Sequence, residues 1–166
     1  MTGMTMTFSE QKILEKCREI ELLCKELYDY FTKLFADNED AVQLWRKTAS
    51  EEQNHADQFS FALKLKKDIH CLVTVDPKRV ESIVSQLQIV IEKVKATPPT
   101  FQDALSSAIK LETYLAEFHL VCVVNFEDQS YKSMFNAMMA SDQEHIASLQ
   151  AALDRINGVQ DWTFTN

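Results

Sequence analysis

The chain has 166 residues, of which 46% are hydrophobic and only two are glycine and three proline, so we expect one compact domain with an almost entirely helical fold. Its formal charge of -8 excludes the basic surface from which nucleic-acid affinity chiefly comes. No apolar stretch approaches the roughly 20 residues of a membrane-spanning helix, and the first residues contain no signal-peptide core, so we expect a cytoplasmic protein with no membrane partner.

The first predicted helix covers residues 9–36, with Ser9 as its N-cap and Asp37 at the break that follows it. Positions spaced alternately three and four apart along this helix are apolar except for one acid, Glu21, and Tyr28 two turns later. Glu21 therefore points into the core, where a charged side chain needs a compensating partner.

The second predicted helix covers residues 39–68 and packs antiparallel to the first, because only a few residues separate the two. Its inward series has apolar ends and a polar centre made of Glu52 and His55. The i, i+3 spacing places both side chains of this pair on one helix face. Glu51 points off that face and is predicted to be solvated.

A further helix is predicted over residues 77–96, with Asp76 as its N-cap and Pro77 in its first turn. It is amphipathic and carries no inward acid–histidine pair, so we interpret it as a connector. Its length of about 30 Å matches that of a bundle, so it can return the chain to the other end. This long crossover makes the bundle helices before and after it parallel.

The third bundle helix is predicted over residues 100–126, and its inward series includes Glu112. His119 lies two turns later on the same face. We interpret His119 as a core histidine with satisfied hydrogen bonds in preference to a metal ligand.

The fourth bundle helix is predicted after a turn at residues 127–129 and ends near residues 157–158. Its inward series carries Asp142 and His145, again three residues apart. Glu144 points off this face and is predicted to be solvated.

Side chains that can bind metal thus occupy positions in all four bundle helices that should be apolar: Glu21, Glu52, His55, Glu112, Asp142 and His145. Burying four ionised carboxylates requires cations, and two divalent ions balance their charge while neutral imidazoles add ligands without charge. One acid and histidine three apart is a weak signal. Two such pairs, each accompanied by an inward acid on another helix, form the ligand set of a carboxylate-bridged dinuclear metal site.

The four cysteines, at positions 17, 24, 71 and 122, form no C-x-x-C pair, which argues against a rubredoxin-type or zinc-ribbon site. Cys17, Cys24 and Cys122 lie on the inward series of their helices. We interpret them as small buried hydrophobic residues, and reduced thiols in a core agree with a cytosolic setting.

Two antiparallel helix pairs, a long crossover and these six residues resemble the ferritin-like superfamily, and within it the rubrerythrin-like branch. The similarity covers roughly residues 8–157, in the segments REIELLCKELYDYF, LWRKTASEEQNHADQF, AIKLETYLAEFH and MMASDQEHIASL. Two carboxylate-x-x-His pairs favour rubrerythrins over classical ferritins, which generally lack the second histidine. The resemblance implies an all-α, ferritin-like four-helix bundle with a long helical crossover between helices two and three, in a single domain over residues 1–166.

The resemblance also implies a pair of irons as cofactor, with bridging carboxylates from Glu52 and Asp142, terminal carboxylates from Glu21 and Glu112, and one imidazole per iron from His55 and His145. This chain departs from the family pattern in two places. Asp142 is one methylene shorter than the usual glutamate, and Leu115 stands where rubrerythrins carry an extra glutamate.

The activity implied by the resemblance is that of an oxidoreductase that reduces hydrogen peroxide or dioxygen. Electrons would come from an external donor, because the chain has no rubredoxin module. Tyr28 is the candidate catalytic residue, as a hydrogen-bond donor to a ligand carboxylate, although a purely structural use of its hydroxyl is also open. Ferritin-like iron oxidation and storage, and a metal-binding bundle without catalysis, are alternatives. Carboxylate and imidazole ligands suit iron, manganese and zinc. We also expect a homo-oligomer, namely a dimer.

Overall fold

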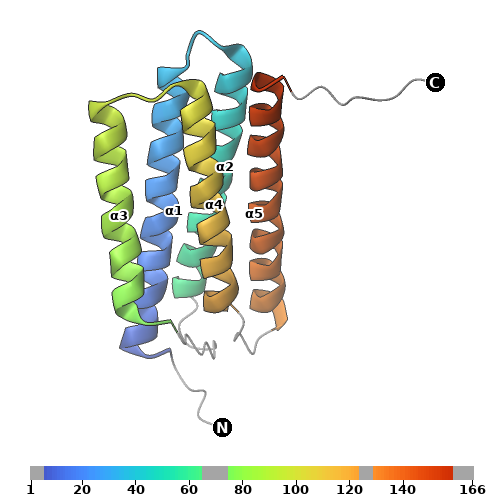
Figure 1. Cartoon of the computed structure of the whole chain (residues 1–166). Helices are drawn as coiled ribbons and strands as arrows, with labels where there is room; N and C mark the ends of the chain where they lie inside the picture. Colours follow the sequence, from blue (N-terminus) through green and yellow to red (C-terminus); the bar gives the residue numbers. More distant parts are fainter. Residues whose placement is uncertain (1–5, 65–74, 124–128, 159–166) are drawn as a thin grey trace, which may run out of the picture.

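The protein is described by a computed structural model over residues 6–64, 75–123 and 129–158, and within these ranges it contains helices and no strand. The helices are α1 (Phe8–Leu34), α2 (Glu39–Lys64), α3 (Pro77–Ala96), α4 (Phe101–Val123) and α5 (Gln129–Ile156). Contacts join α1 to α2, α4 to α5 and α2 to α5, while α3 packs on α1 at the outside of the bundle (Figure 1). The expected all-α bundle is confirmed.

The direction of each helix follows from the connections between them. In Figure 1, α1 and α5 run upward and α2 and α4 run downward, while α3 runs upward and carries the chain back to the top. The helices α2 and α4 are therefore parallel, as a helical crossover requires. One side of α3 covers α1 with apolar residues, of which the buried ones are Val80, Ile83, Val84, Leu87 and Ile91.

The first helix begins at Phe8, one residue before the predicted N-cap. Thr7 is the N-cap: its hydroxyl accepts a hydrogen bond from the Glu10 backbone N–H at 3.2 Å, and the Glu10 carboxylate accepts one from the Thr7 N–H at 2.7 Å. This reciprocal pair is a capping box, which needs an acid or amide three residues after the cap. Ser9 has Lys12 at that position, so it cannot form one.

The other helix limits follow local capping. Asn38 accepts a hydrogen bond from the Ala41 N–H at 3.1 Å at the start of α2, and Asp76 caps α3 with Pro77 in its first turn, as predicted. The helix of residues 9–36 ends at Leu34, and the last one ends at Ile156. The predicted ends of the second and third bundle helices, residues 65–68 and 124–126, lie outside the described ranges, as do Cys71 and the side chain of Cys122.

Aromatic layers lie on either side of a polar centre in the bundle. On one side the Tyr28 and Trp45 rings stack with centroids 5.5 Å apart, and Phe31 lies 4.9 Å from Trp45. On the other side the Phe59 and Phe135 rings are 5.3 Å apart. The expected pattern of apolar ends and a polar centre is confirmed, and these rings exclude water above and below the centre.

The helices also bear on the question of a membrane span. Among the described residues, no helix is both long enough and apolar enough to cross a bilayer. The most hydrophobic helix, α4, still carries acidic and basic side chains along its length, including Asp103, Lys110 and Glu117.

Candidate metal centre

All six predicted ligands are buried at the level between the aromatic layers. Their exposed fractions range from 0% for Glu21 to 3% for His145, and the others, at 2%, are Glu52, His55, Glu112 and Asp142. Each reaches inward because it falls on the buried series of its helix, so the predicted orientation is confirmed for all of them. Cys17 and Cys24 are buried, as expected.

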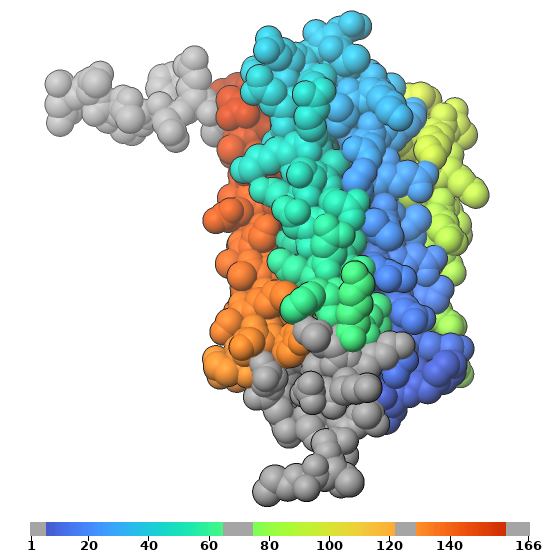
Figure 2. Space-filling model, turned by 180° about the vertical axis from the view of Figure 1, so that it is seen from behind, coloured from blue at the N-terminus to red at the C-terminus, as the bar shows by residue number. Residues whose placement is uncertain are grey.

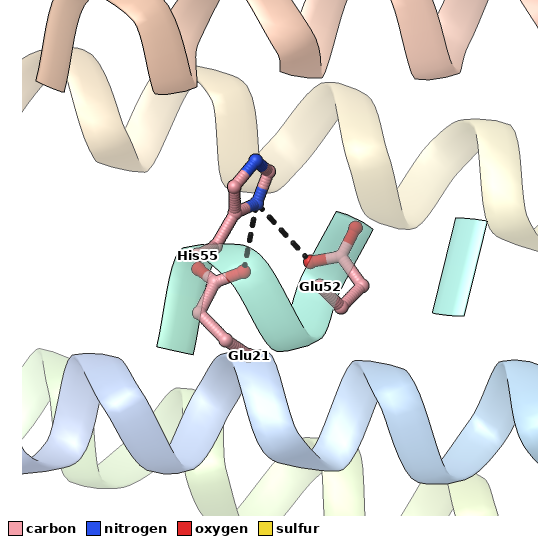
Figure 3. Close-up of side chains that lie close together, drawn as sticks. All are labelled: Glu21, Glu52 and His55. Atoms are coloured by element: carbon pink, nitrogen blue, oxygen red, sulfur yellow. Dashed lines mark ion pairs between the residues drawn. The ribbon is translucent and has the colours of Figure 1, made fainter. Parts of the chain in front are cut away.

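Glu21, Glu52 and His55 form the first of two groups with metal-binding geometry, with one donor atom from each residue lying within 4.8 Å of the others. Figure 3 shows the His55 ring pointing its Nδ1 between the two carboxylates. That nitrogen is 3.3 Å from Glu21 Oε2 and 3.5 Å from Glu52 Oε2. A carboxylate of α1 and the i, i+3 pair of α2 thus converge on one position.

Glu52, Glu112 and His145 form the second group, by the same criterion of 4.8 Å. His145 Nδ1 lies 3.2 Å from Glu52 Oε1 and 3.7 Å from Glu112 Oε2. The two oxygens of Glu52 therefore face different histidines, Oε2 toward His55 and Oε1 toward His145. A carboxylate placed in this way can bridge two metal ions.

Asp142 belongs to neither of these groups, although it is buried beside them. Its Oδ1 is 3.9 Å from His55 Nδ1, and its Oδ2 is hydrogen bonded to His119 Nδ1 at 2.8 Å. The shorter side chain of aspartate accounts for the longer distance to the centre. Asp142 thus faces the first position with one oxygen and His119 with the other.

Several atoms that face the centre have no hydrogen-bond partner among the described residues. They are Oε2 of Glu21, Oε1 of Glu52, and the Nδ1 atoms of His55 and His145. Leaving a buried donor or acceptor unsatisfied costs about 1–3 kcal/mol, and more for a charged group. Metal ions at the two positions would satisfy these atoms, so the donor set fits a dinuclear centre.

The carboxylates of the centre differ in their affinity for protons. Burial acts to raise the pKa of Glu21, but the charge of the neighbouring His119 outweighs this effect and lowers the pKa to about 2. Burial raises the pKa of Glu52 and of Glu112, and the charge of Glu52 raises that of Glu112 further. Glu21 is therefore the carboxylate that stays ionised most readily.

The histidines of the centre bind protons tightly in the absence of metal. Burial acts to lower the pKa of His55, but Glu21 and Glu52 raise it to about 10. Glu112 and Glu52 raise the pKa of His145 to about 11 against the same effect of burial. A bound metal must replace the proton on the nitrogen that faces it, so metal binding and proton release are coupled.

Tyr28 contacts the second group from the aromatic layer. Its hydroxyl donates a hydrogen bond to Glu112 Oε1, which leaves Oε2 as the oxygen nearer to His145. The predicted contact between Tyr28 and a ligand carboxylate is confirmed. Burial, together with the charge of Glu112, raises the pKa of the phenol, so Tyr28 remains a hydrogen-bond donor.

Glu51 does not lie on the solvated face as predicted. Its side chain is only 25% exposed, and its Oε2 forms an ion pair with His145 Nε2, the ring nitrogen that points away from the centre. The residue precedes Glu52 on α2, and sequence periodicity places it at the edge of the inward series. Its contact depends on α5 lying beside α2, which periodicity within one helix does not report.

A surface groove of about 630 Å³ between α2 and α5 reaches the centre at His145. The two helices lie next to each other on the face seen in Figure 2. Residues that line the groove are Asp40, Gln43, Leu44, Lys47, Thr48, Glu51, His145, Ser148, Ala151 and Arg155. Although His145 is only 3% exposed, it therefore borders a solvent-filled space, with Glu51 beside it.

No family model, curated protein or solved structure matches this chain. The chemistry of the centre therefore follows from its own donor atoms. Carboxylate oxygens and imidazole nitrogens suit iron, manganese and zinc alike, so the ligand types alone do not select the metal.

Proposed function

We propose that this protein is a rubrerythrin-like di-iron oxidoreductase that reduces hydrogen peroxide or dioxygen with electrons from an external donor. The observation that carries the proposal is the placement of Glu52, whose Oε2 faces His55 and whose Oε1 faces His145. One carboxylate shared between two histidine-containing groups matches a pair of metal ions acting together, in preference to two separate structural ions.

The chain offers a complete set of ligands for each iron. Glu21, Glu52 and His55 would hold one, with Asp142 Oδ1 beside them, and Glu52, Glu112 and His145 would hold the other. Two ferrous ions held by these residues would supply, on oxidation to the ferric state, the two electrons that together with two protons reduce one hydrogen peroxide to two waters. A reactive metal site also needs open coordination positions, and three or four protein donors per metal leave them.

The groove between α2 and α5 supports access by a small oxidant. Its lining includes His145 and Glu51, so a small oxidant in the groove would lie at the outer edge of the centre. The Glu51 carboxylate is partly exposed and contacts His145 Nε2. Tyr28, which does not line the groove, holds Glu112 through a hydrogen bond to Oε1.

Leu115 bears on whether the metal ligands change during the proposed reaction. It is 2% exposed and packs in the apolar core one turn after Glu112. An additional carboxylate at this position would serve a change of ligand with iron oxidation state. With leucine here, we propose that the ligand set stays the same in both oxidation states.

The proposal is tested with protein purified without oxygen, loaded with ferrous iron, and exposed separately to hydrogen peroxide and to air. We expect about two irons per chain and a ferric absorbance that appears faster with peroxide. Uptake well beyond this amount, with faster oxidation by air, would indicate iron oxidation and storage instead. Iron that binds but reacts with neither oxidant would indicate a metal-binding bundle without catalysis.

A matched pair of substitutions separates the centre from general effects. Glu52→Gln removes the shared carboxylate and should abolish both tight iron binding and rapid oxidation. Glu144→Gln makes the same chemical change on an exposed side chain of α5 and should leave both unchanged. Equal iron binding by the two variants would show that Glu52 is not a bridging ligand, and the proposal depends on that bridge.

A further inference from the structure

His119 lies between two of the proposed ligands and is itself 1% exposed. Its Nδ1 is 2.8 Å from Asp142 Oδ2, in a hydrogen bond, and its Nε2 is 2.8 Å from Glu21 Oε1. The second contact has the distance of an ion pair without the alignment of a hydrogen bond. One imidazole of α4 thus joins a carboxylate of α1 to a carboxylate of α5.

The oxygens of Glu21 and Asp142 that do not contact His119 both point toward the first metal position. Glu21 Oε2 is 3.3 Å from His55 Nδ1, and Asp142 Oδ1 is 3.9 Å from the same nitrogen. Each carboxylate therefore turns one oxygen toward His119 and the other toward the first metal position. Held in this way, each can bind that metal through one oxygen only.

The second metal position is supported differently. Its outer contacts are the Tyr28 hydroxyl on Glu112 Oε1 and the Glu51 carboxylate on His145 Nε2. Removal of His119 should therefore affect one position and spare the other.

We propose that His119 is a positioning residue, which orients Glu21 and Asp142 for the metal position of His55 without itself binding metal. The inference rests on the proposed dinuclear centre. His119 donates its Nδ1–H to Asp142, and it belongs to neither group of three donor atoms that can share an ion. Partners of this kind around ligands fix their orientation, and their loss typically weakens metal binding about 10–100-fold.

This role also explains how Asp142 can act as a ligand although its side chain is shorter than that of glutamate. Asp142 lies farther from His55 Nδ1 than Glu21 or Glu52 does, at 3.9 Å against 3.3 and 3.5 Å. The hydrogen bond from His119 fixes its rotation, so that Oδ1 remains directed at the centre.

The test compares His119→Leu with His119→Asn, whose side chains have the same number of heavy atoms and the same branching. Asparagine keeps a donor near the position of Nδ1 for Asp142, whereas leucine keeps none. Each is combined with His145→Ala, which leaves only the first position intact, and separately with His55→Ala, which leaves only the second. Cobalt(II) affinity is measured by absorption titration against a competing chelator.

In the His145→Ala background we expect His119→Leu to weaken cobalt binding about 10–100-fold and His119→Asn to restore part of the loss. In the His55→Ala background both substitutions should leave the affinity unchanged, which also shows that the bundle still folds. If the leucine variant does not fold, the asparagine variant and His119→Gln, which keeps a donor toward Glu21, provide the same comparison.

Two results would overturn the inference while leaving the dinuclear centre in place. One is an equal cobalt affinity of all His119 variants at the first position. The other is a third strongly shifted imidazole N–H resonance in the proton spectrum of the cobalt protein that disappears in His119→Asn, since this would make His119 a ligand. Failure of the unsubstituted protein to bind cobalt would instead overturn the proposed centre itself, together with this inference.

Discussion

Several side chains of the centre present one polar atom to a candidate metal position and turn another toward a neighbour. Glu112 does so with Tyr28, His145 with Glu51, and Asp142 with His119. Because these outer contacts occupy one atom of each ligand, they decide which atom is left for metal. By contrast, several of the atoms that face inward have no hydrogen-bond partner among the described residues.

Replacement of His55 by alanine tests the ligand assignment. The first group loses its imidazole, so metal content should fall from about two to about one ion per chain. Metal analysis after equilibrium dialysis measures the change, and His145→Ala should give the same content by emptying the other position. Retention of two ions by His55→Ala would show that the ligands are assigned wrongly.

Replacement of Tyr28 by phenylalanine removes the donor to Glu112 with little change in volume. A buried acceptor left without its partner costs about 1–3 kcal/mol, so the free energy of unfolding of the metal-free protein should fall by that amount. Urea denaturation measures it. Tyr114→Phe, at a 40% exposed position on α4, is the control and should change stability by less than about 0.5 kcal/mol.

Helices carry the centre as rigid elements, and their limits depend on local caps. The i, i+3 pairs place two donors on one face of α2 and of α5, so rotation of either helix about its axis would move both donors together. For α1 the rotation is fixed by packing against α2 and α3, and its first turn is held by the Thr7–Glu10 capping box.

Loss of this cap tests where α1 begins. Thr7→Ala should lower the free energy of unfolding by about 1 kcal/mol, because it removes the side-chain acceptor for the Glu10 N–H. Ser9→Ala, within the first turn, should have an effect below about 0.5 kcal/mol. A larger effect at Ser9 in urea denaturation would contradict the assigned start of the helix.

In the whole molecule, the bundle holds buried carboxylates and imidazoles between two aromatic layers. The groove between α2 and α5 borders this core at His145. In the metal-free protein the histidines hold protons that stabilise the folded state. The folded pKa values of about 10 for His55 and about 11 for His145 lie above the ordinary value of 6.5. Their stabilisation is therefore fully present below pH 6.5 and is lost as the pH rises through the folded values.

A bound metal would reverse this dependence, because it would replace the same protons. In the presence of a chelator, the free energy of unfolding should fall as the pH is raised from about 6.5 toward 10. Metal affinity should increase over the same interval, since fewer protons compete for His55 and His145. Urea denaturation and metal competition at several pH values measure the two trends. A rise in metal-free stability across this interval would contradict the assigned charge states.

The sequence by itself determined the helical class, the crossover and the inward direction of all six predicted ligands. These features depend on the period of the α-helix, on turn residues and on the length of the connector, which are local properties of the chain. The same reasoning identified Tyr28 as an inward residue and Asp76 with Pro77 as the start of α3.

Only the tertiary structure decided which atoms meet. The position of Glu52 between two histidines, the contact of Glu51 with His145, and the bridge from His119 to Glu21 and Asp142 join different helices. Such contacts depend on the distance and rotation between helices, which the packing of side chains sets to within an ångström. Periodicity places a side chain on a face but carries no information about the atom opposite.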